Sequence, residues 1–437
     1  MKNKTMRTYK TYRNIFGLAV CLSLPVLTAC SPDDEPVADI HHADAGAMTR
    51  IELKPQNTRL IADGKATLDL LPRVYYTAGE EEMQMLADRV GEDWFEYTAN
   101  GQPVGRYYST KEQSLVGKQI ELKVVAKDNR QLAGTSTVTI LAPAVKKKEY
   151  VIPVVFHVIR ERSDEERTGL VYEKALFDQM IERFNKVFAG EASTSPVGVD
   201  TYIRFKAARF AEDGTLLLEP GVNRVLVDDK MLESPHYAEL IRSNRLNWNP
   251  QRYLNIWLFQ RGQKSLTDAQ TGSCKPAYRE SGATEEPQGL ALADYVPGTS
   301  EFAVDNSGII YQISSIKYGL RSATANTIYP GYNELIHYVG TYLGLLPSFG
   351  IPYPLPDIPN GEDYCDDTVP YMIQPGQSNE YSYKTTDTCY FLSENLMDDP
   401  TGFHNSISKQ QAERMHWVLE HCPDRWAWKS DFAFVGK

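Results

Sequence analysis

The sequence predicts two folded domains, a small all-β domain followed by a larger α+β domain. Short apolar/polar alternations broken by turn residues fill residues 49–144 and predict strands. Residues 149–430 instead combine continuous apolar runs with helical periodicity, which predicts buried strands and covering helices. A chain of 437 residues is long enough to bury two hydrophobic cores.

Residues 1–29 have the organisation of a bacterial lipoprotein signal peptide. A basic start from Lys2 to Arg13 precedes an apolar run from Ile15 to Leu27, and small residues then lead to Cys30. The apolar run is too short for a stable membrane span. We expect the mature protein to begin at a lipidated Cys30, so that acyl chains hold it to a membrane surface. An ordinary signal peptide with an incidental cysteine is the alternative.

Residues 30–48 are expected to form a flexible acidic tether. Asp33, Asp34 and Glu35 follow the cysteine closely, and apolar periodicity is missing. This arrangement resembles the export tether of Bacteroidetes lipoproteins and implies an outer membrane lipoprotein exposed on the cell surface; a plain solvated linker is the alternative. The five cationic residues of the signal leave with it, so the net charge falls from −11 to −16. So acidic a chain argues against nucleic acid as a partner.

Four cysteines remain after residue 30, and their even number in an exported chain favours two disulfides. Their spacing fits no cysteine-based metal site. Three pairings are open. We favour Cys365–Cys389, which would close a loop, and by elimination Cys274–Cys422.

The strands of residues 49–144 predict a small β-sandwich. In one segment Ile120, Leu122 and Val124 share a face, and in the last segment Val138 and Ile140 do. The phrase LIADGKATLDL resembles bacterial immunoglobulin-like domains. That resemblance implies a spacer or a glycan- or protein-binding module.

The larger domain opens with EYVIPVVFHVI, a continuous apolar run typical of a buried strand. Leu176, Met180, Phe184 and Phe188 recur at four-residue spacing and predict a helix. The segments TYIRFKAARF and RYLNIWLFQ read as further strands. A last helix begins at Ser408, which with Gln411 forms a capping box.

The segment HYVGTYLGLLPSFG, residues 337–350, has the pattern of a zinc-protease helix without most of its chemistry. Such helices carry two histidines four residues apart, a glutamate beside the first, a glycine turn and a third histidine. The segment resembles the HExGHxLGLxHxF motif of the pappalysin family of metzincins. His337 matches the first zinc ligand, whereas Tyr338 stands at the general base and Thr341 and Pro347 at the other two ligands.

Further segments resemble the same family in the family's order. The opening strand, RYLNIWLFQ, GEDYCDDTVPY, SENLMDDP and SKQQAERM follow one another across residues 149–422. The resemblance implies a metzincin (zincin) fold akin to zinc-dependent metalloproteinase lipoproteins of Bacteroidetes. It makes Met397 the methionine below the metal site and puts Asp399 where the family has a tyrosine.

One imidazole cannot hold zinc tightly, and without a base bound water is not activated. The sequence therefore predicts no intact catalytic residue and no cofactor. A second register, with Asn333 and Glu334 before His337, also leaves a single histidine. A rebuilt zinc site would need donors such as His404, Glu334 or Asp398; we expect His404, His416 and His421 to be surface or partly buried polar residues instead.

Three functions remain open at this stage. The first is a catalytically inactive pseudoprotease that binds a peptide or protein, for example by strand addition in its cleft. The second is an active metallopeptidase with a non-standard zinc site. The third is an adhesin or scaffold in which the β-domain is the working part. Function resides in the site rather than in the fold, so the site must decide between them.

Overall fold

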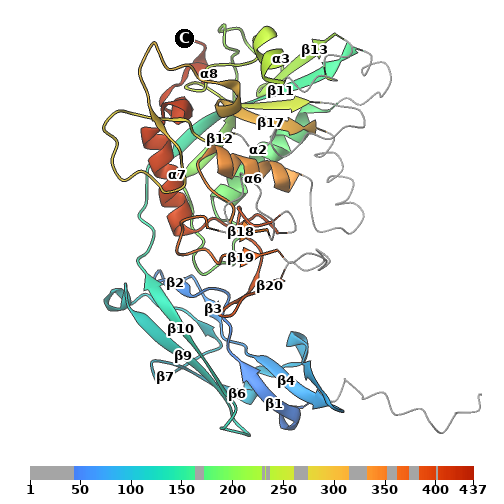
Figure 1. Cartoon of the computed structure of the whole chain (residues 1–437), viewed down its shortest axis with the longest axis vertical. Coiled ribbons are helices and arrows are strands. Elements are labelled where there is room, and N and C mark those ends of the chain that lie inside the picture. The colour runs from blue at the N-terminus through green and yellow to red at the C-terminus, as the bar shows by residue number, and fades with distance from the viewer. Residues whose placement is uncertain are drawn as a thin grey trace, which may run out of the picture. The chain divides into compact units, whose positions relative to one another are not determined.

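The computed structural model describes residues 44–162, 172–228, 232, 237–259, 274–313, 332–351, 362–373, 383–399 and 402–437. The predicted signal peptide, Cys30 and most of the predicted tether lie outside these residues. Among the described residues no helix is both long enough and apolar enough to cross a membrane. The fold is rich in strands and has few helices (Figure 1).

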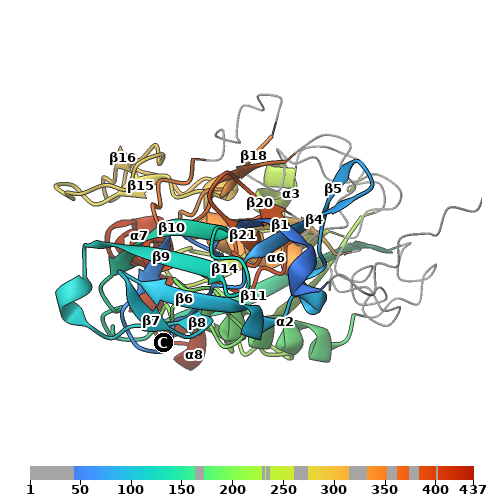
Figure 2. The ribbon, with the colours of Figure 1, turned by 90° about the horizontal axis from the view of Figure 1, so that it is seen from below.

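The N-terminal part is built from strands and single-turn 3₁₀ helices. Its larger sheet has the order β2-β10-β9-β6-β7, with β2 parallel to β10 and the other pairs antiparallel (Figure 2). A second sheet has the order β1-β4-β5, and β3 pairs with β8. The strands are β1 (Met48–Glu52), β2 (Arg59–Ile61), β3 (Leu68–Asp69), β4 (Arg73–Ala78), β5 (Glu81–Gln84), β6 (Phe95–Ala99), β7 (Gln102–Val104), β8 (Tyr107–Tyr108), β9 (Gln119–Ala126) and β10 (Ala133–Leu141).

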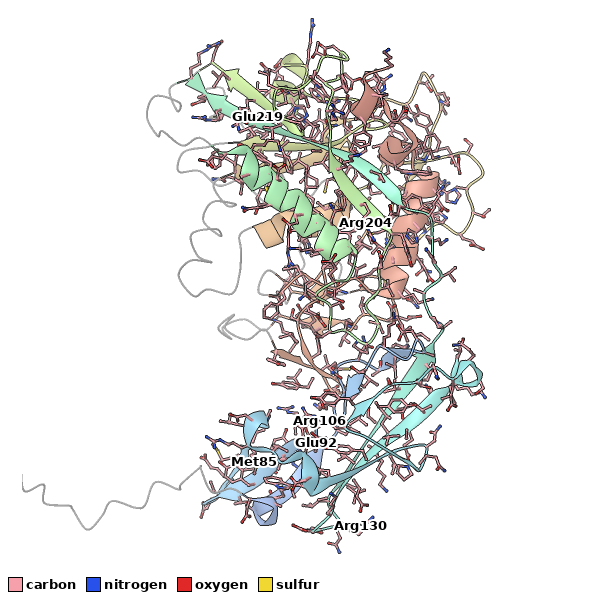
Figure 3. All side chains as sticks on the ribbon, turned by 180° about the vertical axis from the view of Figure 1, so that it is seen from behind. Met85, Glu92, Arg106, Arg130, Arg204 and Glu219 are labelled. Atoms are coloured by element: carbon pink, nitrogen blue, oxygen red, sulfur yellow. The ribbon has the colours of Figure 1, made fainter. Side chains whose placement is uncertain are left out.

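The predicted alternation holds in the two longest of these strands. Ile120, Leu122 and Val124 of β9 are buried, as are Val138 and Ile140 of β10. Between the smaller strands Arg106 forms an ion pair with Asp69 at 2.6 Å and lies 3.7 Å from Glu92 (Figure 3). This part is therefore all-β, as expected, whereas its immunoglobulin-like character remains a prediction.

The second part is organised around a sheet in which every strand pair is parallel. The order is β12-β11-β14-β17, and β13 also pairs with β11. Strand β11 is long enough to pair first with β12 and then with β13 along one edge. The strands are β11 (Tyr150–Glu161), β12 (Ile203–Ala207), β13 (Val222–Val227), β14 (Leu254–Phe259) and β17 (Gly308–Gln312).

Helices cover both faces of this sheet. On one face α2 (Lys174–Phe188), α6 (Tyr332–Tyr342) and α7 (Lys409–His421) share one core with β11 and β14. On the other face α3 (Tyr237–Ser243) and α8 (Phe432–Val435) pack on the alternate residues of the same strands. Burial on both faces explains why β11 and β14 are continuous apolar runs.

Short elements complete this part. They are the parallel pairs β15 (Tyr278–Arg279) with β16 (Ala293–Asp294) and β18 (Phe349–Gly350) with β19 (Tyr371–Met372), the antiparallel pair β20 (Tyr383–Thr385) with β21 (Tyr390–Leu392), and the 3₁₀ helices η7 (Val304–Asn306) and η8 (Pro423–Lys429). Helix α7 begins with the expected capping box, in which the Ser408 hydroxyl accepts from Gln411 N and the Gln411 side chain accepts from Ser408 N.

The four described cysteines are buried and free, so the predicted disulfides Cys365–Cys389 and Cys274–Cys422 are not seen. The surroundings of Cys365 and Cys389 differ. Cys389 packs with aromatic residues of β18, β19 and β21, whereas Cys365 follows the buried Asp363. An even number of cysteines does not show that any two thiols lie within bonding distance, so it was not enough to predict these two disulfides.

Candidate functional site

Helix α6 carries the segment that resembles a zinc-protease helix, and it packs beside β17 (Figure 1). Leu335, Ile336 and Val339 are fully buried in the shared core. Gly344, at a φ of 87°, ends the helix: Leu345 N donates to Gly340 O and Gly344 N to Thr341 O, the hydrogen bonds of a Schellman motif. Only glycine adopts this backbone easily, so the sequence pattern fixes where the chain turns.

The predicted methionine turn lies directly against this helix. A Cβ placed on Gly340 would come within 2.6 Å of Met397 Sδ and 3.0 Å of Leu396 Cδ2, so this glycine is required by close packing. Met397 is fully buried, and its amide donates to Asn395 Oδ1 at 2.8 Å. The helix and the turn that the sequence singled out are therefore brought together.

His337 is held by the same turn. Its Nδ1 donates to the carbonyl oxygen of Leu396 at 3.2 Å, and the carbonyl, which can only accept, assigns the proton to Nδ1. Burial and the neighbouring His404 lower the pKa of His337 to about 3, against the opposing effect of that hydrogen bond. The imidazole is therefore neutral at physiological pH.

The other two ligand positions and the general-base position hold neither a histidine nor a carboxylate. Thr341 is buried, and its hydroxyl donates to His337 O within the helix at 3.4 Å. Pro347 offers no side-chain donor atom. The ring of Tyr338 lies 6.0 Å from that of Tyr311 and packs against the core.

His404 lies next to His337, with ring centroids 5.9 Å apart and planes at 88°. It is almost fully buried, which corrects the expectation of a surface or partly exposed residue, and burial lowers its pKa. Its Nδ1 donates to the same Leu396 oxygen at 2.9 Å. His416 is also buried, with Nε2 2.6 Å from Thr201 O.

The two histidines do not converge on one point. A shared zinc ion would need both Nε2 atoms about 2.0–2.1 Å from it. Nδ1 and Nε2 lie on opposite sides of an imidazole, so two rings that aim Nδ1 at one oxygen turn their Nε2 atoms away from it. His404 Nε2 is buried without a hydrogen-bond partner among the described atoms.

The predicted carboxylate donors are engaged elsewhere. Asp398 accepts from Ser348 Oγ at 2.6 Å, Ser393 Oγ at 2.8 Å and Asn395 N, and burial raises its pKa to about 7. Asp399, where the family has a tyrosine, accepts from Tyr371 at 2.6 Å and pairs with Lys384 at 2.7 Å. The side chains of Asn333 and Glu334 lie outside the described residues.

Within the described part of the chain, no three histidine, cysteine, aspartate or glutamate side chains gather as metal ligands. Among the described residues, the groups at the predicted positions do not fit zinc: the Thr341 hydroxyl donates to backbone, Pro347 has no side-chain donor atom, and the His404 Nδ1 is bound to Leu396 O.

Comparison with known proteins gives matches only among solved structures. No family model and no curated protein matches the chain. The chain is similar to mature mirolysin of Tannerella forsythia bound to a cleaved peptide, at 18% identity and a TM-score of 0.40, over 67% of this chain and 100% of that one. Mirolysin with a bound compound also matches, at 19% identity and a TM-score of 0.37, over 67% of this chain and 100% of that one. A promirolysin mutant of Tannerella forsythia matches at 18% identity and a TM-score of 0.37, over 67% of this chain and 87% of that one. Similarity this low carries no conclusion about activity.

Proposed function

We propose that the protein is a surface lipoprotein whose C-terminal domain retains a metzincin-like, pappalysin-related scaffold and acts by binding a peptide or protein, without cutting it. The observation that carries this proposal is the arrangement at α6. His337 is hydrogen-bonded to Leu396 O and Gly340 packs on Met397, whereas the positions of the general base and of the other two ligands hold Tyr338, Thr341 and Pro347.

The scaffold part of the proposal is supported by the contact between the helix and the methionine turn. These segments are about sixty residues apart in the sequence, and the resemblance to metzincins singles out both of them. Gly340 and Gly344 supply the close approach and the turn that a metzincin helix needs. Attachment to the outer membrane through Cys30 is part of the same proposal and rests on the sequence alone.

The loss of catalysis is supported by the donor chemistry. A catalytic zinc ion keeps three protein ligands and a water molecule that a general base deprotonates. Here one histidine of the expected set remains, and an aromatic ring occupies the position of the base. The two positions of the absent histidines cannot be filled by Asp398, whose oxygens accept from two serines.

The test is metal content combined with cleavage. We would purify the mature protein without chelators, measure zinc per chain, and incubate the protein with a mixed peptide library followed by mass spectrometry. We expect far less than one zinc per chain and intact peptides. One zinc per chain that disappears in His337→Ala, together with cut peptides that a chelator protects, would refute the proposal and establish an active metallopeptidase with a non-standard site.

A further inference from the structure

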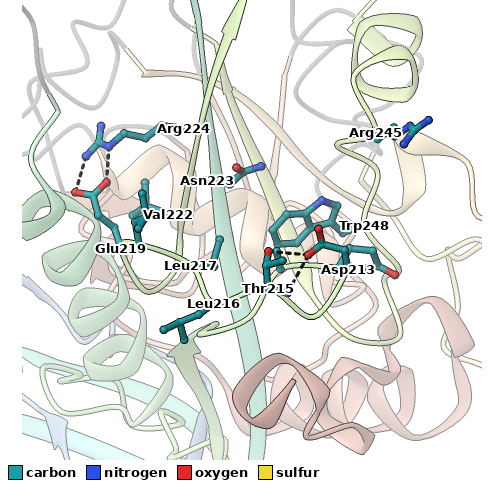
Figure 4. A pocket seen from close by; sticks show the side chains of 13 residues that line it. Asp213, Thr215, Leu216, Leu217, Glu219, Val222, Asn223, Arg224, Arg245 and Trp248 are labelled. Atoms are coloured by element: carbon teal, nitrogen blue, oxygen red, sulfur yellow. Dashed lines mark hydrogen bonds and ion pairs between the residues drawn. The ribbon is translucent and has the colours of Figure 1, made fainter. Parts of the chain in front are cut away.

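A cavity of about 600 Å³ lies beside β13 of the parallel sheet, and no residue of α6 lines it. Its walls are the loop between β12 and β13, the first residues of β13, and the segment that follows α3 (Figure 4). We call it the β13 cavity. Its size falls in the range of small-molecule and peptide side-chain sites, about 300–1,000 Å³. Strand β13 pairs only with β11 among the described strands, and its first residue, Val222, also forms an isolated antiparallel bridge with Glu219.

A buried relay fixes one polar group of this cavity. Asn255 Nδ2 donates to the carbonyls of Trp248 at 2.8 Å and Ser307 at 3.2 Å, so the Asn255 oxygen must accept from His157 Nε2 at 3.1 Å. His157 Nδ1 is then an acceptor, and Asn223 Nδ2 donates to it at 3.0 Å. Burial lowers the pKa of His157 to about 4, which keeps it neutral.

The relay decides which atom Asn223 offers to a ligand. Its nitrogen faces His157, so its Oδ1 is turned the other way, and Asn223 lines the β13 cavity. Asn255 and His157 are fully buried and cannot reorient to let the amide flip. The cavity therefore presents a preorganised hydrogen-bond acceptor, as specific binding sites do.

Among the described residues, Glu212, Glu219 and Arg224 of the cavity take part in ion pairs, whereas Asp213 and Arg245 do not. Glu219 is bound to Arg224, and Glu212 accepts from Asn249 N at 3.0 Å and lies 3.7 Å from Arg252. Asp213 accepts from the amide and hydroxyl of Thr215. Arg245, across the cavity from Glu219 in Figure 4, is exposed and forms no ion pair with any described residue.

Arg245 also occupies a backbone position that suits glycine. Its φ is 54°, and Leu246 N donates to Ile241 O in the closing turn of α3. A left-handed conformation is unfavourable for a non-glycine residue, because its Cβ comes close to the following carbonyl oxygen. The side chain makes no stabilising pair in return, so a role outside the fold explains its presence better than stability does. Leu216 and Leu218 also line the cavity, are 62% and 101% exposed, and offer it apolar surface.

We propose that the β13 cavity binds an extended peptide segment carrying an acidic side chain. The carboxylate pairs with Arg245, a backbone N–H of the peptide donates to Asn223 Oδ1, and a neighbouring apolar side chain covers Leu216 and Leu218. This inference rests on the proposed binding function and gives it a location and a ligand class. The site is separate from the cleft beside α6 that the sequence pattern suggested, since no residue of α6 lines the cavity.

The test uses two blocked, fluorescein-labelled hexapeptides, one alternating leucine with glutamate and one alternating leucine with glutamine. Fluorescence anisotropy measures their affinity for the mature protein, for Arg245→Gln and for Arg242→Gln. Arg242 is the matched control because it is exposed in α3, three residues before Arg245, and does not line the cavity. We expect the glutamate peptide to bind about threefold more tightly, with this preference lost in Arg245→Gln and kept in Arg242→Gln.

The proposed peptide site is overturned by any of three results. These are equal affinity for the two peptides, a preference for the glutamate peptide that survives Arg245→Gln, and no binding of either peptide. Mass spectrometry of the same samples keeps the two proposals apart. Cut peptides would refute the proposed loss of catalysis, whereas the dependence on Arg245 is judged from the affinities alone. A second variant, Leu218→Ser, should weaken both peptides equally, because it removes apolar contact without changing charge.

Discussion

His337 and His404 direct the same ring nitrogen, Nδ1, at one carbonyl oxygen, that of Leu396. The arrangement fixes both tautomers, with the proton on Nδ1, and the two ring planes stand at 88° to each other. Metal-binding histidines commonly donate their second nitrogen to a backbone carbonyl, so each ring alone is oriented like a ligand. Together, with both Nδ1 atoms on one oxygen, they do not have the arrangement of two ligands of one metal ion.

Restoring the absent side chains should restore zinc binding. The triple variant Tyr338→Glu, Thr341→His, Pro347→His places two further imidazoles and a base around His337, on a helix that already ends at a glycine turn. We expect about one zinc per chain by elemental analysis. The same variant with His337→Ala is the control and should bind much less. A folded triple variant without zinc would show that α6 lacks the metzincin geometry.

Gly340 should tolerate no side chain. Alanine is the better helix former by about 1 kcal/mol, yet its Cβ would lie 2.6 Å from Met397 Sδ. We expect Gly340→Ala to lower the free energy of unfolding by about 1–3 kcal/mol in denaturant titrations. Gly105→Ala is the control, since no atom lies within 4 Å of the added methyl group. An unchanged midpoint in Gly340→Ala would mean that the methionine turn is displaced from the helix.

Arg425 joins three segments of the larger domain. Its guanidinium donates to the carbonyls of Tyr342, Cys274 at 2.7 Å and Asn306 at 2.8 Å, and it pairs with the buried Asp424 at 3.3 Å. Arg425→Met leaves a buried carboxylate and three carbonyls without their donor, so it should destabilise the fold by about 3–5 kcal/mol. The measurement is the urea midpoint.

The control for Arg425 is Arg130→Met, which removes an exposed ion pair with Glu96. Its midpoint should not move measurably, because solvent screens such pairs. If both variants behaved alike, the buried network would not be a main support of the fold.

His157 should make stability depend on pH. Its folded pKa of about 4 lies below the unfolded value of about 6.5, so the unfolded chain binds the proton first. Its contribution to stability is complete above pH about 6.5 and is lost as the pH falls towards 4, at up to about 1.4 kcal/mol per pH unit. Urea midpoints across this range should fall less steeply in His157→Gln. Parallel pH profiles would contradict the buried neutral imidazole.

The described cysteines should react as protected thiols. Cys274, Cys365, Cys389 and Cys422 are free and buried, and burial raises the pKa of Cys274 to about 12. Because the thiolate is the reactive form, we expect slow alkylation in the native protein and four modified cysteines after unfolding without reductant. Two or no modified cysteines in the unfolded sample would reinstate the disulfides that the sequence argument favoured.

Periodicity predicted most of the framework. The burial of Met180, Phe184 and Phe188 and the capping box of Ser408 with Gln411 follow from patterns within single segments. Such patterns depend on neighbours in the chain, so one sequence is enough to see them.

The site depended on contacts that no local pattern encodes. The burial of His404, the free state of Cys365 and the relay from Asn255 to Asn223 involve segments far apart in the chain. For Arg245 the sequence held no signal, because its left-handed backbone comes from the way α3 ends. Motif spacing could name His337 and Met397 as neighbours only through the resemblance to a family with a known arrangement.

Strand β11 has a consequence for how the chain reaches this state. It pairs with β12, β13 and β14, so its hydrogen bonds require partners up to Phe259, roughly a hundred residues downstream. Sheets that depend on distant partners fold slowly, since the entropy of the intervening chain is lost before the contacts form. Until the chain up to Phe259 is in place, β11 lacks partners along its length, and such an apolar strand is prone to aggregate. A chaperone that binds residues 150–161 until β14, up to Phe259, is available for pairing should therefore reduce aggregation during folding.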